Sequence, residues 1–340
     1  MNIFITGGAG FIGCNLADFH LKRGDHVVVF DNLSRKGTDA NLKWLQDNYG
    51  DQLVFIRGDI RNYDQVTSAL ETNTDLIYHM AGQVAVTTSV VDPREDFEIN
   101  ALGTFNVLES ARHVAPKAVF FYASTNKVYG GMEASSLTED ETRYRYLNFP
   151  LGISEQQPLD FHSPYGCSKG SGDQYVRDYA RIYGLRTVVM RQSCIYGTRQ
   201  LGVEDQGWIA YFCIAAHQNR KITIYGNGKQ VRDVLWVDDL IRAYDLAYKK
   251  IDIAAGQIYN IGGGPGNTIS IWKEFGPLLD GLVGNDVQFE LADWRPGDQQ
   301  VYISDIRKAG DELGWIPEVS VQAGVEHLWD WITSTPELFG

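Results

Sequence analysis

Tyr165 and Lys169 are the two residues whose types and spacing point most directly to chemistry. They form a YxxxK pattern at the start of a helix predicted over 165–183, and a separation of four residues places both side chains on one helix face. A tyrosine alone keeps its proton at neutral pH. A neighbouring ammonium group would stabilise the phenolate, lower its pKa and make Tyr165 a general base. The pattern also occurs by chance on helical surfaces, so its meaning depends on its surroundings.

Thr125 is a third candidate catalytic residue. It lies in the segment Ser124–Gly130, just beyond a strand predicted over 118–122. Ligands of open parallel sheets bind at the carboxyl ends of the strands. A hydroxyl at that end can therefore hydrogen-bond a reacting oxygen and relay its proton to Tyr165. The alternative is that Thr125 only caps the turn or helix that follows.

A glycine-rich turn at the start of the chain predicts a dinucleotide site. Gly7, Gly10 and Gly13 follow the first predicted strand and open the first predicted helix. The first glycine permits a tight turn, the second lets the backbone approach a pyrophosphate, and the third lets the helix pack closely on the sheet. Phe11 and Ile12 lie between these glycines and belong to the same predicted site. The alternative is a structural turn that binds nothing.

Acidic residues after the second and third predicted strands favour a particular cofactor. Asp31 lies close to the position where an acid contacts the ribose hydroxyls of adenosine, and its carboxylate would repel a 2′-phosphate. We therefore expect NAD rather than NADP, although the basic residues Arg35 and Lys36 that follow argue in the opposite direction. Asp59 and Ile60 are placed to flank the adenine. The alternative for Asp59 is that it caps the next helix.

Strand-like and helical segments alternate along the first half of the chain. Strands are predicted over 3–6, 26–30, 53–56, 75–79, 118–122 and 187–191, and helices over 11–23, 42–48, 65–71, 95–114 and 165–183. This alternation predicts an α/β fold with a Rossmann-type, doubly wound parallel sheet. After residue 196 the pattern becomes irregular, which predicts a smaller C-terminal α/β substrate lobe. We assign 1–191 to an NAD-binding Rossmann domain, with 229–254 returning to it, and 192–340 mainly to the substrate-binding lobe.

The composition argues against several classes of protein. The 340 residues are 44% hydrophobic, enough for a sizeable core, and the formal net charge is −13, which argues against a nucleic-acid-binding protein. The four cysteines lack zinc-ligand spacing, so we expect reduced thiols and no metal site. No signal peptide is recognisable, and the longest apolar run, 208–216, is too short to cross a bilayer. We expect a cytoplasmic protein without a membrane partner.

Taken together, these motifs resemble the extended short-chain dehydrogenase/reductase family nearly from end to end. The resemblance rests on the Gly7–Gly13 turn, the Tyr165–Lys169 motif and the segments 79–82, 124–130 and 226–233. It implies a tightly bound, recycled NAD, a nucleotide-sugar substrate and a homodimer or homotetramer. Lys169 would also hold the nicotinamide ribose. The further cofactor-binding residues that the resemblance implies are Asn32, Ser34, Arg35, Ala81, Gln83, Asn100 and Ser124.

Longer matching segments narrow the resemblance to CDP-sugar 2-epimerases of that family. These segments are 31–37, 124–130, 160–169 and 205–208. Where dehydratases of the family carry an Asp-Glu pair after the catalytic threonine, this chain has Asn126 and Lys127, which cannot supply the acid for loss of water. Where many 4-epimerases carry an asparagine, it has Cys194. The substrate-binding residues that the resemblance implies are Thr125, Asn126, Gln206, Arg232 and Arg295, with the two arginines on the diphosphate.

The reaction that this resemblance implies is inversion at C2, from CDP-paratose to CDP-tyvelose. Paratose lacks a hydroxyl at C3, so no ketone can form there, and a ketone at C4 would acidify the hydrogens at C3 and C5 only. Direct oxidation of the C2 hydroxyl and re-reduction of the 2-keto sugar from its other face is the remaining route. Alternatives are another CDP-hexose such as CDP-glucose, a nucleotide-sugar 4-epimerase, a net oxidoreductase, or a non-catalytic NAD-sensing protein. The substrate class suggests a surface-glycan pathway such as lipopolysaccharide biosynthesis.

Overall fold

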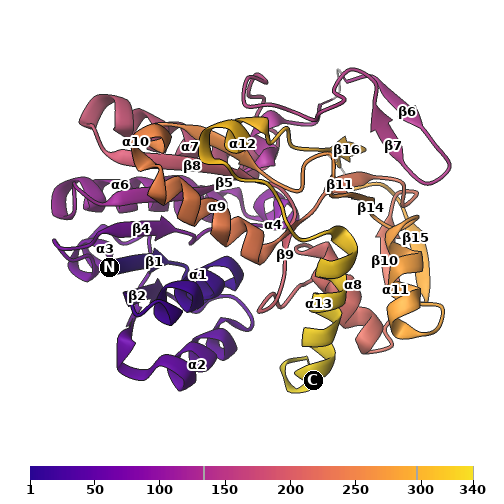
Figure 1. Ribbon diagram of the computed structural model, residues 1–340, viewed down its shortest axis with the longest axis horizontal. Helices are drawn as coiled ribbons and strands as arrows, with labels where there is room; N and C mark the ends of the chain where they lie inside the picture. The colour runs from indigo at the N-terminus through magenta and orange to yellow at the C-terminus, as the bar shows by residue number, and fades with distance from the viewer. Residues whose placement is uncertain (133–134, 296–297, 340) are drawn as a thin grey trace.

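The computed structural model describes residues 1–132, 135–295 and 298–339. A seven-stranded parallel sheet forms the larger lobe, in the order β13-β8-β5-β4-β1-β2-β3 (Figure 1). Its strands are β1 (Asn2–Thr6), β2 (His26–Asp31), β3 (Leu53–Arg57), β4 (Leu76–His79), β5 (Val119–Thr125), β8 (Arg186–Gln192) and β13 (Ile258–Ile261). The predicted doubly wound parallel sheet is confirmed. Its order reverses between β1 and β4, which is where such sheets bind ligands.

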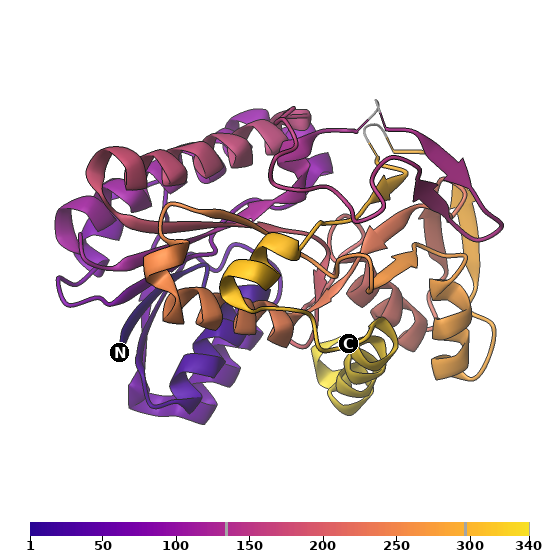
Figure 2. The same ribbon diagram turned by 45° about the horizontal axis from the view of Figure 1, so that its top comes forward.

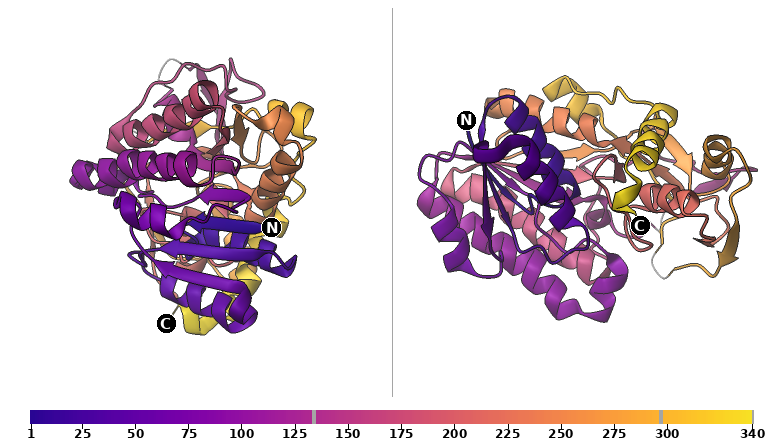
Figure 3. Two further views of the ribbon diagram at one scale, coloured as in Figure 1. Left: turned by 90° about the vertical axis from the view of Figure 1, so that its left-hand side faces the viewer. Right: turned by 90° about the horizontal axis from the view of Figure 1, so that it is seen from below.

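Helices cover both faces of this sheet because successive strand side chains point to opposite sides. Ile3 and Ile5 of β1 belong to one core with α1 (Phe11–Lys22), α2 (Thr38–Tyr49) and α9 (Val237–Lys249). Phe4, between them, belongs to a second core with α3 (Tyr63–Ala69), α6 (Gly103–Val114) and α7 (Ser163–Tyr183). Figure 2 and Figure 3 show the two helical layers on opposite sides of the sheet.

The smaller lobe consists of short strands and three helices. Strand β11 (Val231–Asp233) lies between β14 (Thr268–Ser270) and β16 (Val301–Tyr302), while β10 (Ile222–Tyr225) pairs with β15 (Phe289–Ala292). Two further pairs are β9 (Ile195–Tyr196) with β12 (Leu235–Trp236), and β6 (Leu137–Glu139) with β7 (Tyr144–Tyr146). The helices are α8 (Trp208–His217), α11 (Phe275–Val283) and α13 (Val321–Ser334). Aromatic rings of Phe212, Trp272 and Phe275 pack together between them.

The bounds of several predicted elements shift by a few residues, and two elements differ more clearly from the observed ones. Strand β5 extends past residue 122, because Ser124 and Thr125 still pair with Arg191 and Gln192 of β8. The helix predicted over 95–114 is interrupted: α5 (Pro93–Phe97) is followed by a π-helical turn, η2 (Glu98–Leu102), and then by α6. Short helices α4 (Val86–Val91), α10 (Ile251–Ala254) and α12 (Arg307–Leu313) complete the larger lobe.

The return of the chain to the larger lobe also differs from the range 229–254. Strand β11 belongs to a sheet of the smaller lobe, so the return begins only at α9, which packs against α1. It then continues beyond residue 254, because β13 pairs with β8 as the edge strand of the main sheet. The division of the chain at residues 191 and 192 stays a prediction. Within the described residues, no helix combines the length and apolar character needed to span a membrane.

Candidate active site

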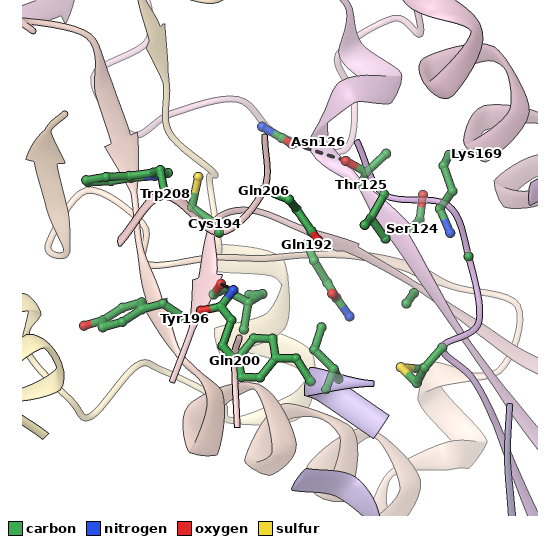
Figure 4. Close-up of a pocket in the computed structure, with 18 of the residues that line it drawn as sticks. Ser124, Thr125, Asn126, Lys169, Gln192, Cys194, Tyr196, Gln200, Gln206 and Trp208 are labelled. Carbon is green, nitrogen blue, oxygen red and sulfur yellow. Dashed lines mark hydrogen bonds between the residues drawn. The ribbon is translucent and has the colours of Figure 1, made fainter. Parts of the chain in front are cut away.

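Three adjoining pockets form one cleft at the carboxyl ends of the sheet strands. The turn pocket is lined by the glycine turn and the segments after β2 and β3. The tyrosine pocket, drawn in Figure 4, is lined by the end of β5 and the start of α7. The arginine pocket reaches the smaller lobe at Arg232 and Arg295. Gln206 lines all three pockets and Tyr165 lines the second and third, so the cleft is continuous.

The glycine turn leaves no room for side chains at two of its positions. Gly7 has a φ of +68°, and a Cβ atom there would lie 2.5 Å from the backbone nitrogen of Ala81. A Cβ atom on Gly13 would lie 2.2 Å from the backbone oxygen of Gly7, closer than real Cβ atoms approach. Gly10 caps α1 without any side-chain hydrogen bond. The amino end of α1 therefore presents its backbone N–H groups to the pocket, which suits a pyrophosphate.

Asp31 and Asp59 both line the turn pocket, but they differ in their partners. The Asp31 carboxylate accepts backbone N–H bonds from Ala9 at 3.1 Å and Leu33 at 2.8 Å, which hold it at the end of β2. Burial nevertheless raises its pKa. Asp59 forms a 2.7 Å ion pair with Arg61. The cap of α3 is Asn62 rather than Asp59, so the helix-capping alternative for Asp59 is not what the structure shows.

The other predicted residues at this end lie around the same pocket. Asn32, Ser34, Arg35, Ile60 and Ala81 all line it. Asn32 also donates a 3.2 Å hydrogen bond to Asp59. Arg35 donates from its guanidinium to Oε1 of Gln206, a residue from the smaller-lobe side of the cleft. This hydrogen bond, which we call the Arg35–Gln206 bridge, joins a residue of the turn pocket to one that lines all three pockets.

Gln83 and Asn100 are outside the walls of the three pockets, unlike the other predicted cofactor residues. Asn100 is almost fully buried and binds the backbone of Gln83 twice, accepting from its N–H at 2.9 Å and donating to its carbonyl at 3.0 Å. It also donates to Asp96. Asn100 thus fixes the loop after β4 that carries Ala81 and Gly82 into the cleft. Its geometry is that of a positioning residue.

Tyr165 is the third residue of α7 and is 8% exposed, at the junction of two pockets. Its backbone N–H donates to the Ser89 hydroxyl at 3.2 Å, which anchors the start of the helix. Burial raises the pKa of Tyr165 to about 12, against the lowering effect of its side-chain hydrogen bond with Thr125 and of the charge on Arg35. Thr125 lines the pocket and also caps the 3-10 turn η3 (Asn126–Tyr129) through the N–H of Lys127, and its catalytic role stays a prediction.

Lys169 shares the pocket with Tyr165, and an effect of its ammonium group on the phenol stays a prediction. The nitrogen lies 4.3 Å from the ring centroid of Tyr122. Burial lowers the pKa of Lys169 to about 7, although Asp173 and Asp96 oppose this effect. The positive charge of Arg35 lowers the pKa of Tyr165. With only its own side chains in the cleft, the chain therefore keeps Tyr165 protonated at neutral pH.

A buried ion pair supports the end of β5 behind the pocket. Arg191 of β8 binds Asp173 of α7 through two bonds of 2.9 Å, and both side chains are almost fully buried. The Ser124 hydroxyl donates to the same carboxylate at 2.7 Å. Arg191 also donates to the Tyr129 hydroxyl, which donates to Asn260 of β13. This network fixes the backbone that presents Thr125.

The two predicted diphosphate-binding arginines point into the arginine pocket. Arg232, on β11, forms a 2.7 Å ion pair with Asp298. Arg295 pairs with Asp205 at 3.2 Å and stacks over the ring of Tyr225 at 3.9 Å. Both guanidinium groups retain further N–H donors for an oxyanion. No cluster of three or more His, Cys, Asp or Glu in the described ranges could hold a metal ion.

Sequence reasoning did not assign a function to Ser89, Lys127 or Gln192, although all three contribute to the site. Gln192, at the end of β8, extends into the tyrosine pocket in Figure 4 and donates to the Tyr244 hydroxyl at 2.7 Å. Lys127 lines the arginine pocket. Cys194 and Trp208 lie across the pocket from Asn126 in the same view. The positions of Gln192 and Lys127 at carboxyl ends of strands were the available signal.

Comparisons with known proteins agree with this geometry. A family model described as GDP-mannose 4,6 dehydratase matches residues 4–328. A protein named CDP-paratose 2-epimerase from Salmonella typhi is 46% identical over 340 residues, which cover 98% of this chain and all of that protein. A protein named putative UDP-glucose 4-epimerase from Methanocaldococcus jannaschii is 31% identical and covers 97% of this chain and 98% of its own.

Solved structures show the same architecture. A UDP-glucuronic acid 4-epimerase from Bacillus cereus, in complex with UDP-glucuronic acid and NAD, has a TM-score of 0.84 at 28% identity and covers 98% of this chain and 99% of its own. A dTDP-glucose 4,6-dehydratase from Streptomyces venezuelae with NAD bound has a TM-score of 0.84 at 28% identity. The match covers 99% of this chain and 98% of that chain. The chain therefore belongs to the GDP-mannose 4,6 dehydratase family of enzymes, within the extended short-chain dehydrogenases/reductases.

Proposed function

We propose that this chain is an NAD-dependent nucleotide-sugar epimerase that inverts C2 of a CDP-sugar, converting CDP-paratose to CDP-tyvelose. The observation that carries the proposal is its 46% full-length identity to a CDP-paratose 2-epimerase. The cleft supports it, because it joins a dinucleotide turn to the three predicted catalytic residues Thr125, Tyr165 and Lys169.

The residues of the turn pocket fit NAD. Gly7 and Gly13 have no side chain that could block the turn. The amino end of α1 has no side-chain cap, so its backbone N–H groups can bind a pyrophosphate. The Asp31 carboxylate at the end of β2 suits ribose hydroxyls and disfavours a 2′-phosphate. When bound, NAD supplies a positively charged nicotinamide ring that takes a hydride from C2 and later returns it. The Arg35–Gln206 bridge would lie across the exit of such a cofactor.

Tyr165 acts as the general base in this proposal. It accepts the proton of the C2 hydroxyl through Thr125, and it can do so at neutral pH only beside a bound positive charge, because burial alone raises its pKa to about 12. Lys169 holds the nicotinamide ribose. After the 2-keto sugar has turned its other face, Tyr165 returns the proton to the same oxygen. Proton and electron pair are both restored, so the reaction consumes no cofactor.

The walls of the tyrosine pocket favour epimerisation over dehydration. Loss of water from a sugar needs an acid beside the leaving hydroxyl. Among the described residues that line this pocket there is no aspartate or glutamate. Asn126 stands next to Thr125 and accepts a hydrogen bond from its hydroxyl at 3.3 Å (Figure 4). This wall distinguishes the chain from the dehydratases whose family model it matches.

The test is incubation of purified protein with CDP-paratose, CDP-glucose or UDP-glucose, without added NAD, followed by NMR of the sugar. Inversion at C2 of a CDP-sugar supports the proposal. Inversion at C4 would identify a 4-epimerase, and stoichiometric formation of NADH with added NAD would identify a net oxidoreductase. Failure to invert C2 of any CDP-sugar overturns the proposal.

We also propose that the enzyme is a homodimer or homotetramer. Apolar side chains are exposed along neighbouring helices of one sheet face: Val91 is 86% exposed, Phe97 58% and Ile182 66%. Burying such a surface between two copies would be favourable. Light scattering of the wild type and of a Phe97→Asp variant measures it, and a monomeric wild type would contradict this assembly.

A further inference from the structure

Lys127 is a partly buried cation in the wall of the arginine pocket, two residues after Thr125. Its ammonium group donates one hydrogen bond, at 3.2 Å, to the side-chain oxygen of Gln299. An ammonium group has three N–H donors. In contrast to Arg232 and Arg295, Lys127 has no ion pair with any carboxylate in the described part of the chain.

A cation in a pocket wall without a carboxylate partner destabilises the folded protein. Burial and, to a smaller extent, the charge of the nearby Arg232 lower the pKa of Lys127 to about 8, although Asp298 opposes this. Two cations therefore face one carboxylate at this depth of the pocket. An oxyanion that enters between Lys127 and Arg232 would correct the imbalance. The proposed substrate brings such a group, because its diphosphate links the nucleoside to C1 of the sugar.

The position of Lys127 relative to Thr125 then relates the phosphate to the reacting carbon. Thr125 and Tyr165 act on the hydroxyl of the carbon that is oxidised. C2 is bonded to C1, which carries the phosphate, whereas C4 lies across the sugar ring from C1. A cation that lines the same pocket as Thr125 can therefore reach the phosphate nearest the sugar when C2 is the reacting carbon. When C4 reacts, the ring separates the two.

We propose that Lys127 binds the phosphate nearest the sugar, and thereby places C2 rather than C4 against Thr125 and Tyr165. This inference rests on the proposed function, since it assumes a nucleoside-diphosphate sugar in the cleft. It makes Lys127 a positioning residue that determines which carbon reacts. Arg232 contributes the second cation of the same phosphate site. Of these two cations, Lys127 lies closer to Thr125 in the sequence.

The first experiment compares CDP and CMP binding by isothermal titration calorimetry, with wild type, Lys127→Gln and Lys127→Arg. CMP lacks the second phosphate, which is the one nearest the sugar in the substrate. We expect Lys127→Gln to weaken CDP binding by about 10- to 100-fold, the usual range for a hydrogen bond between charged groups, and to leave CMP binding unchanged. Lys127→Arg should retain most of the affinity for CDP. Lys221→Gln, on the exposed surface of the smaller lobe, is the matched control for loss of one positive charge.

Equal CDP affinity in wild type and Lys127→Gln overturns the inference, as does an equal loss for CDP and CMP. If the glutamine variant does not fold, Lys127→Met, which keeps the apolar stem of the buried side chain, gives the same comparison. The titrations are repeated with UDP and UMP. Tighter binding of UDP and UMP than of CDP and CMP by the wild type would contradict the proposed CDP-sugar. The role of Lys127 would then be decided by comparing UDP with UMP binding in the wild type and the variant.

A second experiment measures which carbon is oxidised. CDP-glucose deuterated at C2 or at C4 is incubated with each variant, and the deuterium transferred to the bound cofactor is measured by mass spectrometry. We expect the wild type to take label from C2, and Lys127→Gln to take a larger share from C4. An unchanged share in the variant overturns the positioning role even if CDP binding is weakened.

Discussion

Replacement of Lys169 by methionine should make the protein without bound nucleotide more stable at low pH, although it should abolish catalysis. Lys169 is 6% exposed, and burial lowers its pKa from 10.5 to about 7. Because the folded-state pKa lies below that of the unfolded chain, the unfolded chain binds more protons between these two values. The free energy of unfolding of the wild type therefore rises with pH between these two pKa values. At lower pH, the charged lysine destabilises the folded protein.

The magnitude follows from the two pKa values. At about 1.4 kcal/mol per pH unit, the lowering from 10.5 to about 7 corresponds to about 5 kcal/mol at pH 6. By pH 9 this cost falls to about 2 kcal/mol. The cation–π contact with Tyr122 exists only while Lys169 is charged, so its loss offsets about 1 kcal/mol at pH 6 and nothing at pH 9. We therefore expect Lys169→Met to raise the free energy of unfolding by about 4 kcal/mol at pH 6 and by about 2 kcal/mol at pH 9.

Urea denaturation at pH 6 and pH 9, followed by circular dichroism, measures this difference. Lys43→Met on α2 is the control, because its side chain is exposed and pairs only with Asp47 within the helix. The control should change stability by less than about 1 kcal/mol at both pH values. If Lys169→Met lowers stability at pH 6, or changes it equally at both pH values, then burial does not destabilise the lysine charge and the reasoning is refuted.

Three further predictions concern the cleft. Tyr165→Phe should retain bound NAD yet lose about 10²- to 10⁴-fold in kcat, measured by NMR of the sugar, and near-normal turnover would exclude Tyr165 as the base. Gly13→Ala should abolish NAD binding in an equilibrium dialysis assay, because its Cβ atom would lie 2.2 Å from a backbone oxygen; unchanged affinity would mean that α1 can shift freely. Arg35→Met removes the Arg35–Gln206 bridge and should release NAD faster in stopped-flow fluorescence. An unchanged release rate would show that the bridge does not retain the cofactor.

The central sheet could be predicted because its strands are continuous apolar runs. Helices cover both faces of the sheet, so successive side chains such as Ile3, Phe4 and Ile5 are all buried. Their sequence is therefore a continuous apolar run rather than an alternation of apolar and polar residues. The smaller lobe could not be resolved in this way. Its strands β9, β12 and β16 have two residues each, too few for any periodicity. Strand β13 was missed because its position depends on pairing with β8, far away in the sequence.

The site was predictable where function requires a local motif. The glycine turn and the Tyr165–Lys169 spacing are both contained within short segments. Contacts between distant segments were not predictable, and the Arg35–Gln206 bridge joins residues 171 positions apart. The contacts of Asn100 could not be predicted from the sequence either. They depend on how the loop after β4 folds against the Asn100 side chain. The electrostatic states of Tyr165 and Lys169 depend on burial, which spacing does not report.

Strand β13 has a consequence for how the chain is made. It completes the main sheet at the edge of β8, and its Asn260 binds Tyr129, which in turn contacts Arg191 behind the catalytic strand. A ribosome synthesises β8 well before β13, so the growing chain carries an open sheet edge with unpaired backbone groups until residues 258–261 have emerged. The catalytic strand β5 therefore receives this support only late in the synthesis of the larger lobe. Chaperone protection of that edge would matter most during this interval.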